Sequence, residues 1–93
     1  MSDLQAQFEA AVEQVRNAPS DGDFKPDNDY KLKMYGLYRQ ATDGDVSGKR
    51  PGMLKPIERF KYDAWANLKG TNKEDAMQQY IDEVEKVAQQ YGS

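Results

Sequence analysis

The stretch DGDVSGKRPGML, residues 43–54, limits most strongly how this chain can fold. It contains three glycines and a proline and shows no hydrophobic periodicity, so we expect it to connect two elements. Connections between helices in a compact bundle are usually about 2–8 residues long. A longer connection allows the next helix to run parallel to its predecessor instead of turning back beside it.

Two helices are expected before this connection, because apolar residues recur there every three or four positions. The first, ending near Asn17, has the apolar positions Leu4, Phe8, Ala11, Val12 and Val15. Ser2 and Gln5 have the form of a capping box at its start. The second helix follows Pro26 and is expected to have one of Asp27, Asn28 and Asp29 as its N-cap. Its predicted core positions are Tyr30, Met34, Leu37 and Ala41.

Two more helices are expected after the connection. The third should begin near Pro56 and end with Gly70 at its C′ position, with the core stripe Ile57, Phe60, Ala64 and Leu68. Thr71 and Glu74 have the form of a capping box for the fourth. Its stripe comprises Met77, Tyr80, Ile81, Val84, Val87 or Ala88, and Tyr91. No segment reads as a strand, so the predicted fold class is all-α.

Within the connection, Arg50, Pro51 and Gly52 are expected to form a turn, and Met53 and Leu54 to pin the loop to the core. A chain of 93 residues predicts a single domain, residues 1–93, with a small core. It contains no cysteine, no secretory signal and no run of about 20 apolar residues. These features favour an intracellular, soluble protein without stable membrane insertion.

Positive charge gathers in the middle of this acidic chain. The net charge is −3 overall, but residues 30–61 carry eight basic and three acidic side chains. Residues 1–29 and 62–93 are both net negative. The middle third could therefore present an anion site, or its bases could pair with acids on neighbouring helices.

The second predicted helix carries another stripe beside its core face, namely Lys31, Tyr35, Tyr38 and Thr42, with Arg39 at its edge. Tyrosine rings stack on planar bases, and arginine and lysine bind phosphates. With Lys61 near the apolar side of the third helix, these residues suit an anionic, partly aromatic ligand. The alternative is that the tyrosines pack at the rim of the core, while Lys61 lays its aliphatic part on apolar surface and keeps its ammonium group in water. Overall acidity disfavours single-stranded nucleic acid as the ligand.

Catalysis has little support in the sequence. Histidine and cysteine are absent, and the four serines lie at the termini or in predicted loops, where nothing supplies a base. The DGD runs at 21–23 and 43–45 lack the downstream glutamate of a calcium loop. We therefore expect no enzymatic activity, no metal site and no cofactor.

The order of several motifs resembles the acyl-CoA-binding protein family. These motifs are YGLYRQATDGD, KRPGML, KYDAWANLKGTNKEDAMQQYI and VEKVAQQYG, and the similarity runs from about Phe8 to Tyr91. The resemblance implies a four-helix bundle of up-down-down-up topology with a bowl-shaped site for medium- to long-chain acyl-CoA. It also implies a cytoplasmic, monomeric carrier in fatty acid metabolism.

The resemblance further implies roles for particular residues. Tyr38 would stack on the adenine, and Tyr35, Arg39 and Lys61 would contact the phosphates. Tyr80 would close the adenosine pocket, and Arg16 matches a basic position near the headgroup. The positions that would line the acyl groove are Phe8, Ala11 or Val12, and Leu32.

Three features depart from the family pattern. Arg39 stands where a lysine is usual, Tyr62 replaces a common tryptophan, and the loop NAPSDGDFKP is several residues longer. The longer loop leaves the preferred chain length open. The alternative function is a helical protein-interaction module that uses the surface around Tyr35 and Tyr38.

Overall fold

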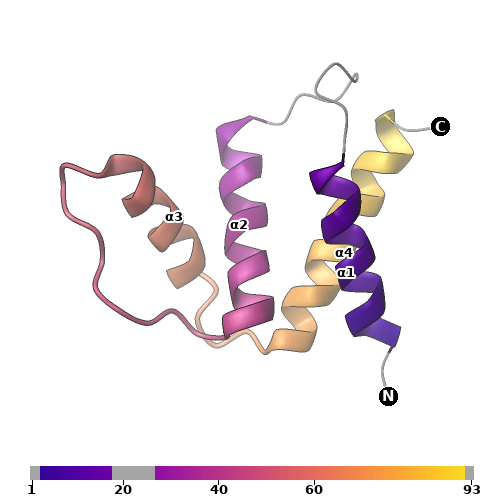
Figure 1. Ribbon diagram of the computed structural model, residues 1–93, viewed down its shortest axis with the longest axis horizontal. Coiled ribbons are helices and arrows are strands. Elements are labelled where there is room, and N and C mark those ends of the chain that lie inside the picture. The colour runs from indigo at the N-terminus through magenta and orange to yellow at the C-terminus, as the bar shows by residue number, and fades with distance from the viewer. Residues whose placement is uncertain (1–2, 18–26, 92–93) are drawn as a thin grey trace.

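The computed structural model describes residues 3–17 and 27–91, which form four α-helices and no strand (Figure 1). The helices are α1 (Asp3–Arg16), α2 (Asn28–Asp43), α3 (Pro56–Ala66) and α4 (Lys73–Tyr91). Asp27 is the N-cap of α2, because its carboxylate accepts a hydrogen bond from the backbone N–H of Tyr30 at 2.8 Å. The all-α prediction is confirmed, whereas Ser2 of the first predicted capping box lies outside the described residues.

The long connection makes α2 and α3 parallel neighbours. In Figure 1, α1 and α4 run upward and α2 and α3 run downward. After α2 ends, residues 44–55 travel back along the outer side of α3 to the level at which α2 begins. A short link could not cover that distance, and the up-down-down-up topology is confirmed.

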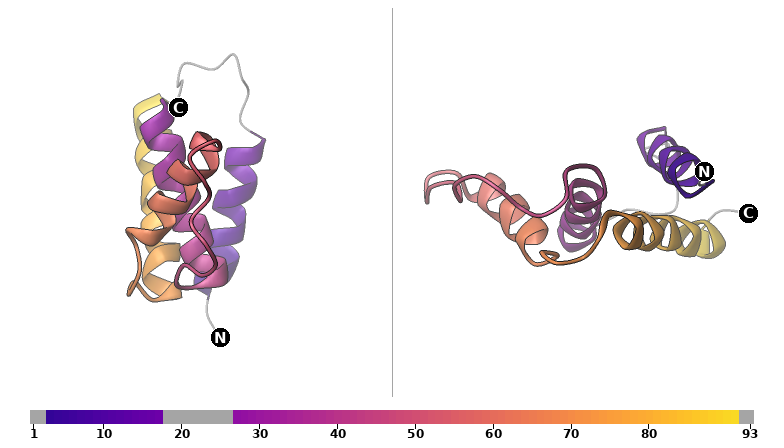
Figure 2. Two further views of the ribbon diagram at one scale, coloured as in Figure 1. Left: turned by 90° about the vertical axis from the view of Figure 1, so that its left-hand side faces the viewer. Right: turned by 90° about the horizontal axis from the view of Figure 1, so that it is seen from below.

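The hydrophobic core lies where α1, α2 and α4 meet. Both α1 and α2 pack against α4, whereas α3 packs against α2. The buried cluster comprises Phe8, Ala11, Val12, Met34, Leu37, Ala41, Ala76, Met77, Tyr80, Ile81 and Val84. Figure 2 shows α3, α2 and α4 in a row with α1 beside α4, in a molecule measuring 41 × 36 × 17 Å.

The predicted boundary between the third and fourth helices is wrong. α3 ends at Ala66, and Gly70 lies beyond it in a turn with a φ of 95°. Asn72, not Thr71, caps α4, because its side-chain oxygen accepts a hydrogen bond from the backbone N–H of Asp75 at 2.7 Å. Asparagine is at least as good an N-cap as threonine, so the adjacent residue displaced the expected one.

Four apolar side chains that were expected in the interior are exposed instead. Their exposed fractions are 83% for Met53, 97% for Leu54, 61% for Ile57 and 56% for Phe60. Among the helices, α2 is the one against which α3 packs, so much of α3 faces the connection or solvent, and Trp65 is its buried residue. Val15 near the end of α1 is also exposed.

Polar bonds, rather than Met53 and Leu54, attach the connection to α3. Three side chains of the two segments donate these bonds, and one carboxylate and two backbone carbonyls accept them. Trp65 Nε1 donates to the Gly44 carbonyl (2.7 Å), Tyr62 Oη to the Gly48 carbonyl (3.0 Å), and Arg50 to both Asp63 carboxylate oxygens (2.9 and 2.7 Å). The Arg50 guanidinium lowers the pKa of Asp63. The predicted turn lies slightly later in the chain, where the Lys55 N–H donates to the Gly52 carbonyl at 3.0 Å.

The backbones of α2 and α3 lie very close together at Gly36. A Cβ built on Gly36 would lie 2.7 Å from the backbone oxygen of Ala64 and 3.3 Å from Cδ1 of Leu68. Side chains cannot be tolerated at such a distance from backbone atoms, so glycine is required for the two helices to pack this closely. The contact thereby sets the positions of the α3 side chains that lie against α2.

A fully buried glutamine joins the end of α2 to the α3–α4 connection. Gln40 Nε2 donates to the Asp45 carboxylate at 2.9 Å and to the Thr71 carbonyl at 2.7 Å. Asp45 also accepts a hydrogen bond from the backbone N–H of Gly70 at 2.9 Å. That bond, with the one from Gln40, lowers the pKa of Asp45. Three separate segments are thus fixed around one polar side chain.

We predict that Gly36→Ala destabilises the fold by about 1–3 kcal/mol, because the added methyl group must push α3 away from α2. Urea denaturation measures the change in unfolding free energy. Gly52→Ala is the matched control, since no atom lies within 4 Å of its Cβ position and its φ is not positive. Equal stability of the two variants would show that the Gly36 contact does not constrain the packing.

We predict that Asp45→Asn lowers the thermal midpoint at neutral pH, and that this difference shrinks in acid. The folded-state pKa of Asp45 is depressed. Its ionised form therefore stabilises the fold above the unfolded pKa of about 4, and this contribution is lost as pH falls through the lower folded value. Thermal unfolding across that pH range measures the effect. The control Asp82→Asn removes a carboxylate that accepts a hydrogen bond from Gln78 of its own helix, and a matching pH profile for both variants would contradict the prediction.

Candidate functional site

Lys61 of α3 lies against Tyr35 of α2. Its Nζ atom is 5.5 Å from the centroid of the Tyr35 ring, within the range of a cation–π interaction. Tyr35 is half-buried and Lys61 is exposed, so the ammonium group remains open to solvent on one side. The structure therefore brings together two predicted site residues from helices that lie far apart in the sequence.

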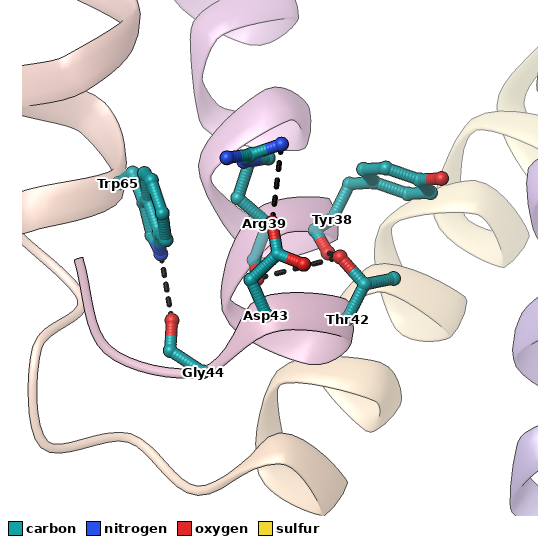
Figure 3. Close-up of polar contacts among 6 residues, drawn as sticks. All are labelled: Tyr38, Arg39, Thr42, Asp43, Gly44 and Trp65. Carbon is teal, nitrogen blue, oxygen red and sulfur yellow. Dashed lines mark hydrogen bonds and ion pairs between the residues drawn. The ribbon is translucent and has the colours of Figure 1, made fainter. Parts of the chain in front are cut away.

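Arg39 lies over the indole of Trp65 (Figure 3). The guanidinium carbon is 4.5 Å from the ring centroid, and Nη1 forms an ion pair with Asp43 at 3.1 Å, one helical turn away. The Nε atom of Arg39 is buried and has no hydrogen-bond partner among the described residues. Arg39 is thus held against α3 while part of its hydrogen-bonding capacity is unused.

Tyr38, the neighbour of Arg39, points the other way. Successive residues of a helix differ by about 100° in direction, and in Figure 3 the Tyr38 ring extends away from Trp65. It stacks on Phe8 of α1, with ring centroids 6.1 Å apart and an angle of 28° between the planes. Tyr80 of α4 meets the same Phe8 ring edge to face, at 5.2 Å and 74°. Phe8 therefore links two of the predicted site tyrosines.

Tyr80 is a core residue as well as a predicted site residue, since only 4% of it is exposed. Burial raises the pKa of its hydroxyl, and the nearby Tyr30 raises it further, whereas the positive charge of Arg16 opposes the shift. Arg16, at the end of α1, is exposed and close enough to Tyr80 to act on it electrostatically. The two predicted residues are therefore neighbours.

Leu32 is half-buried and lies in a different environment. It lines a groove of about 360 Å³ between α2, α3 and Gln79 of α4, together with Leu37, Phe60, Ala64 and other residues. Lys33, which also lines this groove, is about 160° around α2 from Tyr35. The groove therefore opens on another side of α2 from the Tyr35–Lys61 pair.

Apart from Leu32, the predicted residues thus lie around one side of α2. Tyr35 and Lys61 lie together, Arg39 is held toward α3, and Tyr38 lies toward α1 with Tyr80 and Arg16 behind it. This surface offers cations from different helices beside partly exposed aromatic rings. Such an arrangement is suited to an anionic ligand with a planar ring, because cations bind phosphates while aromatic faces stack on bases.

The described residues offer neither a cluster of metal-binding side chains nor a membrane-spanning helix. Among residues 3–17 and 27–91, no three histidine, cysteine, aspartate or glutamate side chains are grouped so that they could hold a metal ion. In the same part of the chain, no helix combines the length and apolarity needed to cross a bilayer.

The family model described as acyl CoA binding protein matches residues 5–84. This range includes the first three helices almost completely and most of α4. The chain belongs to the acyl-CoA-binding protein family.

Relatives in this family include much longer proteins. Acyl-CoA-binding domain-containing protein 5 of Xenopus tropicalis is 46% identical over 83 residues, which cover 89% of this chain and 18% of the relative. Its counterpart in Mus musculus is 43% identical, over 89% of this chain and 16% of the relative. The chain therefore spans less than a fifth of the length of these relatives.

Solved structures of family members share the fold along nearly all of the chain. An acyl-CoA-binding protein from Moniliophthora perniciosa gives a TM-score of 0.88 at 40% identity, covering 97% of this chain and 83% of that one. Acyl-CoA-binding protein 2 of Oryza sativa gives 0.84 at 39% identity, covering 94% and 92%. The four-helix arrangement is therefore that of the family.

Two residues at this site were missed by the sequence analysis. Trp65 belongs to one of the family motifs but was given no role of its own, and no local pattern connects it with Arg39. Asp43, by contrast, is four residues after Arg39, a spacing that favours an ion pair and could have been noticed. The cation–π pair itself needed the helix packing, since its partners belong to different helices.

Proposed function

We propose that this chain binds medium- to long-chain acyl-CoA esters and carries them without changing them chemically. Lys61 above the Tyr35 ring is the observation that carries the proposal, because it places a solvent-facing cation and an aromatic ring at one spot. Membership of the acyl-CoA-binding protein family and the similarity to solved members support it. The proposed unit is one acyl-CoA-binding domain, residues 1–93.

The nucleotide end of the ligand is proposed to lie between the Tyr35–Lys61 pair and Tyr38. Lys61 would act as a point charge for a phosphate, and the Tyr35 hydroxyl would donate to a phosphate oxygen. Tyr38 would stack on the adenine, beside Tyr80, which closes the pocket from α4, and near Arg16.

Arg39 contributes a second cation from a constrained position. Its guanidinium is already supported by Trp65 and Asp43, so little side-chain freedom is left to lose when a phosphate binds. Replacement of the usual family lysine by Arg39 changes a point charge into a planar fork that stacks on the indole. We infer that this substitution keeps the charge and fixes its direction.

The acyl chain is proposed to bind on apolar surface that includes Leu32. Three further positions named for the groove are buried in the core, namely Phe8, Ala11 and Val12. They therefore lie beneath this surface and expose little area for the acyl chain. Each methylene removed from water contributes about 0.8 kcal/mol, so a long chain provides most of the difference between an ester and free CoA. Sequestering the ester would suit a cytoplasmic, monomeric buffer and transporter in fatty acid metabolism that needs no cofactor.

We predict that titration calorimetry shows much tighter binding of palmitoyl-CoA than of free CoA. The physical reason is the burial of the acyl chain, which free CoA lacks. Absence of heat with the ester, or equal affinity for both ligands, would contradict the proposed function.

We predict that Lys61→Ala weakens palmitoyl-CoA binding by about tenfold or more, and Tyr35→Phe by less, because Lys61 supplies a positive charge to the phosphate whereas Tyr35 supplies only a hydroxyl donor. Both variants should keep thermal midpoints close to that of the unchanged protein, since Lys61 is exposed. Lys86→Ala, which removes an exposed lysine of α4, is the control and should bind normally. If either site variant mainly lowers the thermal midpoint, its residue has a packing role.

A further inference from the structure

Large exposed apolar side chains are concentrated at the turn before α3 and in the first half of α3, where Phe60 also borders the groove beside α2. Met53, Leu54, Ile57 and Phe60 fall within eight consecutive residues, and more than half of each is exposed. We call residues 49–61 the α3 edge. In Figure 1 this segment forms the margin of the molecule farthest from α1 and α4, and α3 packs against α2 alone. Contiguous exposed apolar side chains of this kind mark interaction surfaces.

The α3 edge is also strongly basic. Lys49, Arg50, Lys55, Arg59 and Lys61 belong to it, and Glu58 is its one acidic residue. Arg50 is paired with Asp63, whereas Lys49 and Lys55 are exposed at either side of the apolar turn. The opposite side of the molecule is acidic, since α1 and α4 have more acidic than basic residues. An anionic surface would therefore attract the α3 edge and repel the far side, which fixes one orientation.

The shape of the α3 edge favours a lipid surface over a protein. Stable protein interfaces bury about 800 Å² on each partner across a well-fitted patch. Here the most exposed side chains, Met53 and Leu54, stand at a turn closed by the Lys55–Gly52 hydrogen bond. A projecting apolar turn with flanking lysines can enter the boundary between lipid headgroups and acyl chains, while the lysines stay at the headgroups.

We propose that the α3 edge docks the protein on anionic lipid bilayers, with Met53 and Leu54 inserted at the interface and Lys49 and Lys55 on the headgroups. This is reversible surface binding, which needs no membrane-spanning helix. It rests on Met53, Leu54, Lys49 and Lys55, none of which belongs to the proposed acyl-CoA site, so it can fail while acyl-CoA binding succeeds, and the reverse.

The test is flotation of the full chain, without acyl-CoA, with vesicles of phosphatidylcholine alone or mixed with phosphatidylserine. Binding is expected to the mixed vesicles and to weaken as salt screens the lysines. The double variant Met53→Ser/Leu54→Ser should bind at least tenfold more weakly, and Lys55→Gln about fivefold more weakly. Val15→Ser, an exposed apolar residue of α1, and Lys86→Gln on α4 are matched controls that should bind normally.

Insertion is measured separately with Leu54→Trp. The fluorescence of the introduced indole should shift to shorter wavelength with anionic vesicles and be quenched by brominated lipid chains. Every variant should still bind palmitoyl-CoA in solution as the unchanged protein does, because none of these residues belongs to the proposed ligand site.

Three outcomes would overturn the proposal. One is a failure of the unchanged protein to bind anionic vesicles at low salt. Another is equal binding by the Met53→Ser/Leu54→Ser variant. The third is a concentration-dependent dimer in sedimentation that Leu54→Ser dissociates, without vesicle binding, which would make the α3 edge a protein interface.

Discussion

The backbone contact between Gly36 and Ala64 is the constraint on which the arrangement of the site depends. α3 has α2 as its packing partner, so its position relative to the rest of the molecule is set along one line of contact. A built Cβ only 2.7 Å from the Ala64 oxygen shows how closely the helices meet. That proximity brings Lys61 to Tyr35 and Trp65 to Arg39. The two cation–π pairs are consequences of the helix packing, and they add to it.

α2 contacts each of the other three helices through different side chains. The core side chains of α2 pack against α4, its Tyr38 ring stacks on Phe8 of α1, and its Arg39 points toward α3. The 100° step between successive residues is enough to send Tyr38 and Arg39 to different helices. A ligand lying across α2 would therefore contact a rigid aromatic group on one side and a cationic group on the other. The aromatic group, Tyr38, packs against the core through Phe8, whereas the cationic group, Arg39, packs against Trp65 of α3.

The sequence was sufficient to predict buried positions where one face of a helix packs against the main core. Apart from Val15, which is exposed, most of the stripe positions of α1, α2 and α4 were predicted because the 3.6-residue period identifies the buried side when a helix packs against a full interior. The same reasoning failed for Ile57 and Phe60, since an apolar stripe does not reveal that α3 has a single partner. The Tyr35–Lys61 pair came from charge, aromatic spacing and family resemblance together. Trp65 beneath Arg39 could not be predicted, because periodicity carries no information about which side chains of two helices meet.

The exposed residues of α3 have a physical implication for the division of roles in this fold. Substitutions of exposed side chains usually change stability by no more than about 0.5 kcal/mol, so Met53 and Leu54 contribute little to folding. The connection is attached instead by Arg50, Tyr62 and Trp65 through polar bonds. Folding therefore leaves the apolar surface of the α3 edge unused, and its exposure to water has a free-energy cost that only contact with another apolar surface can remove.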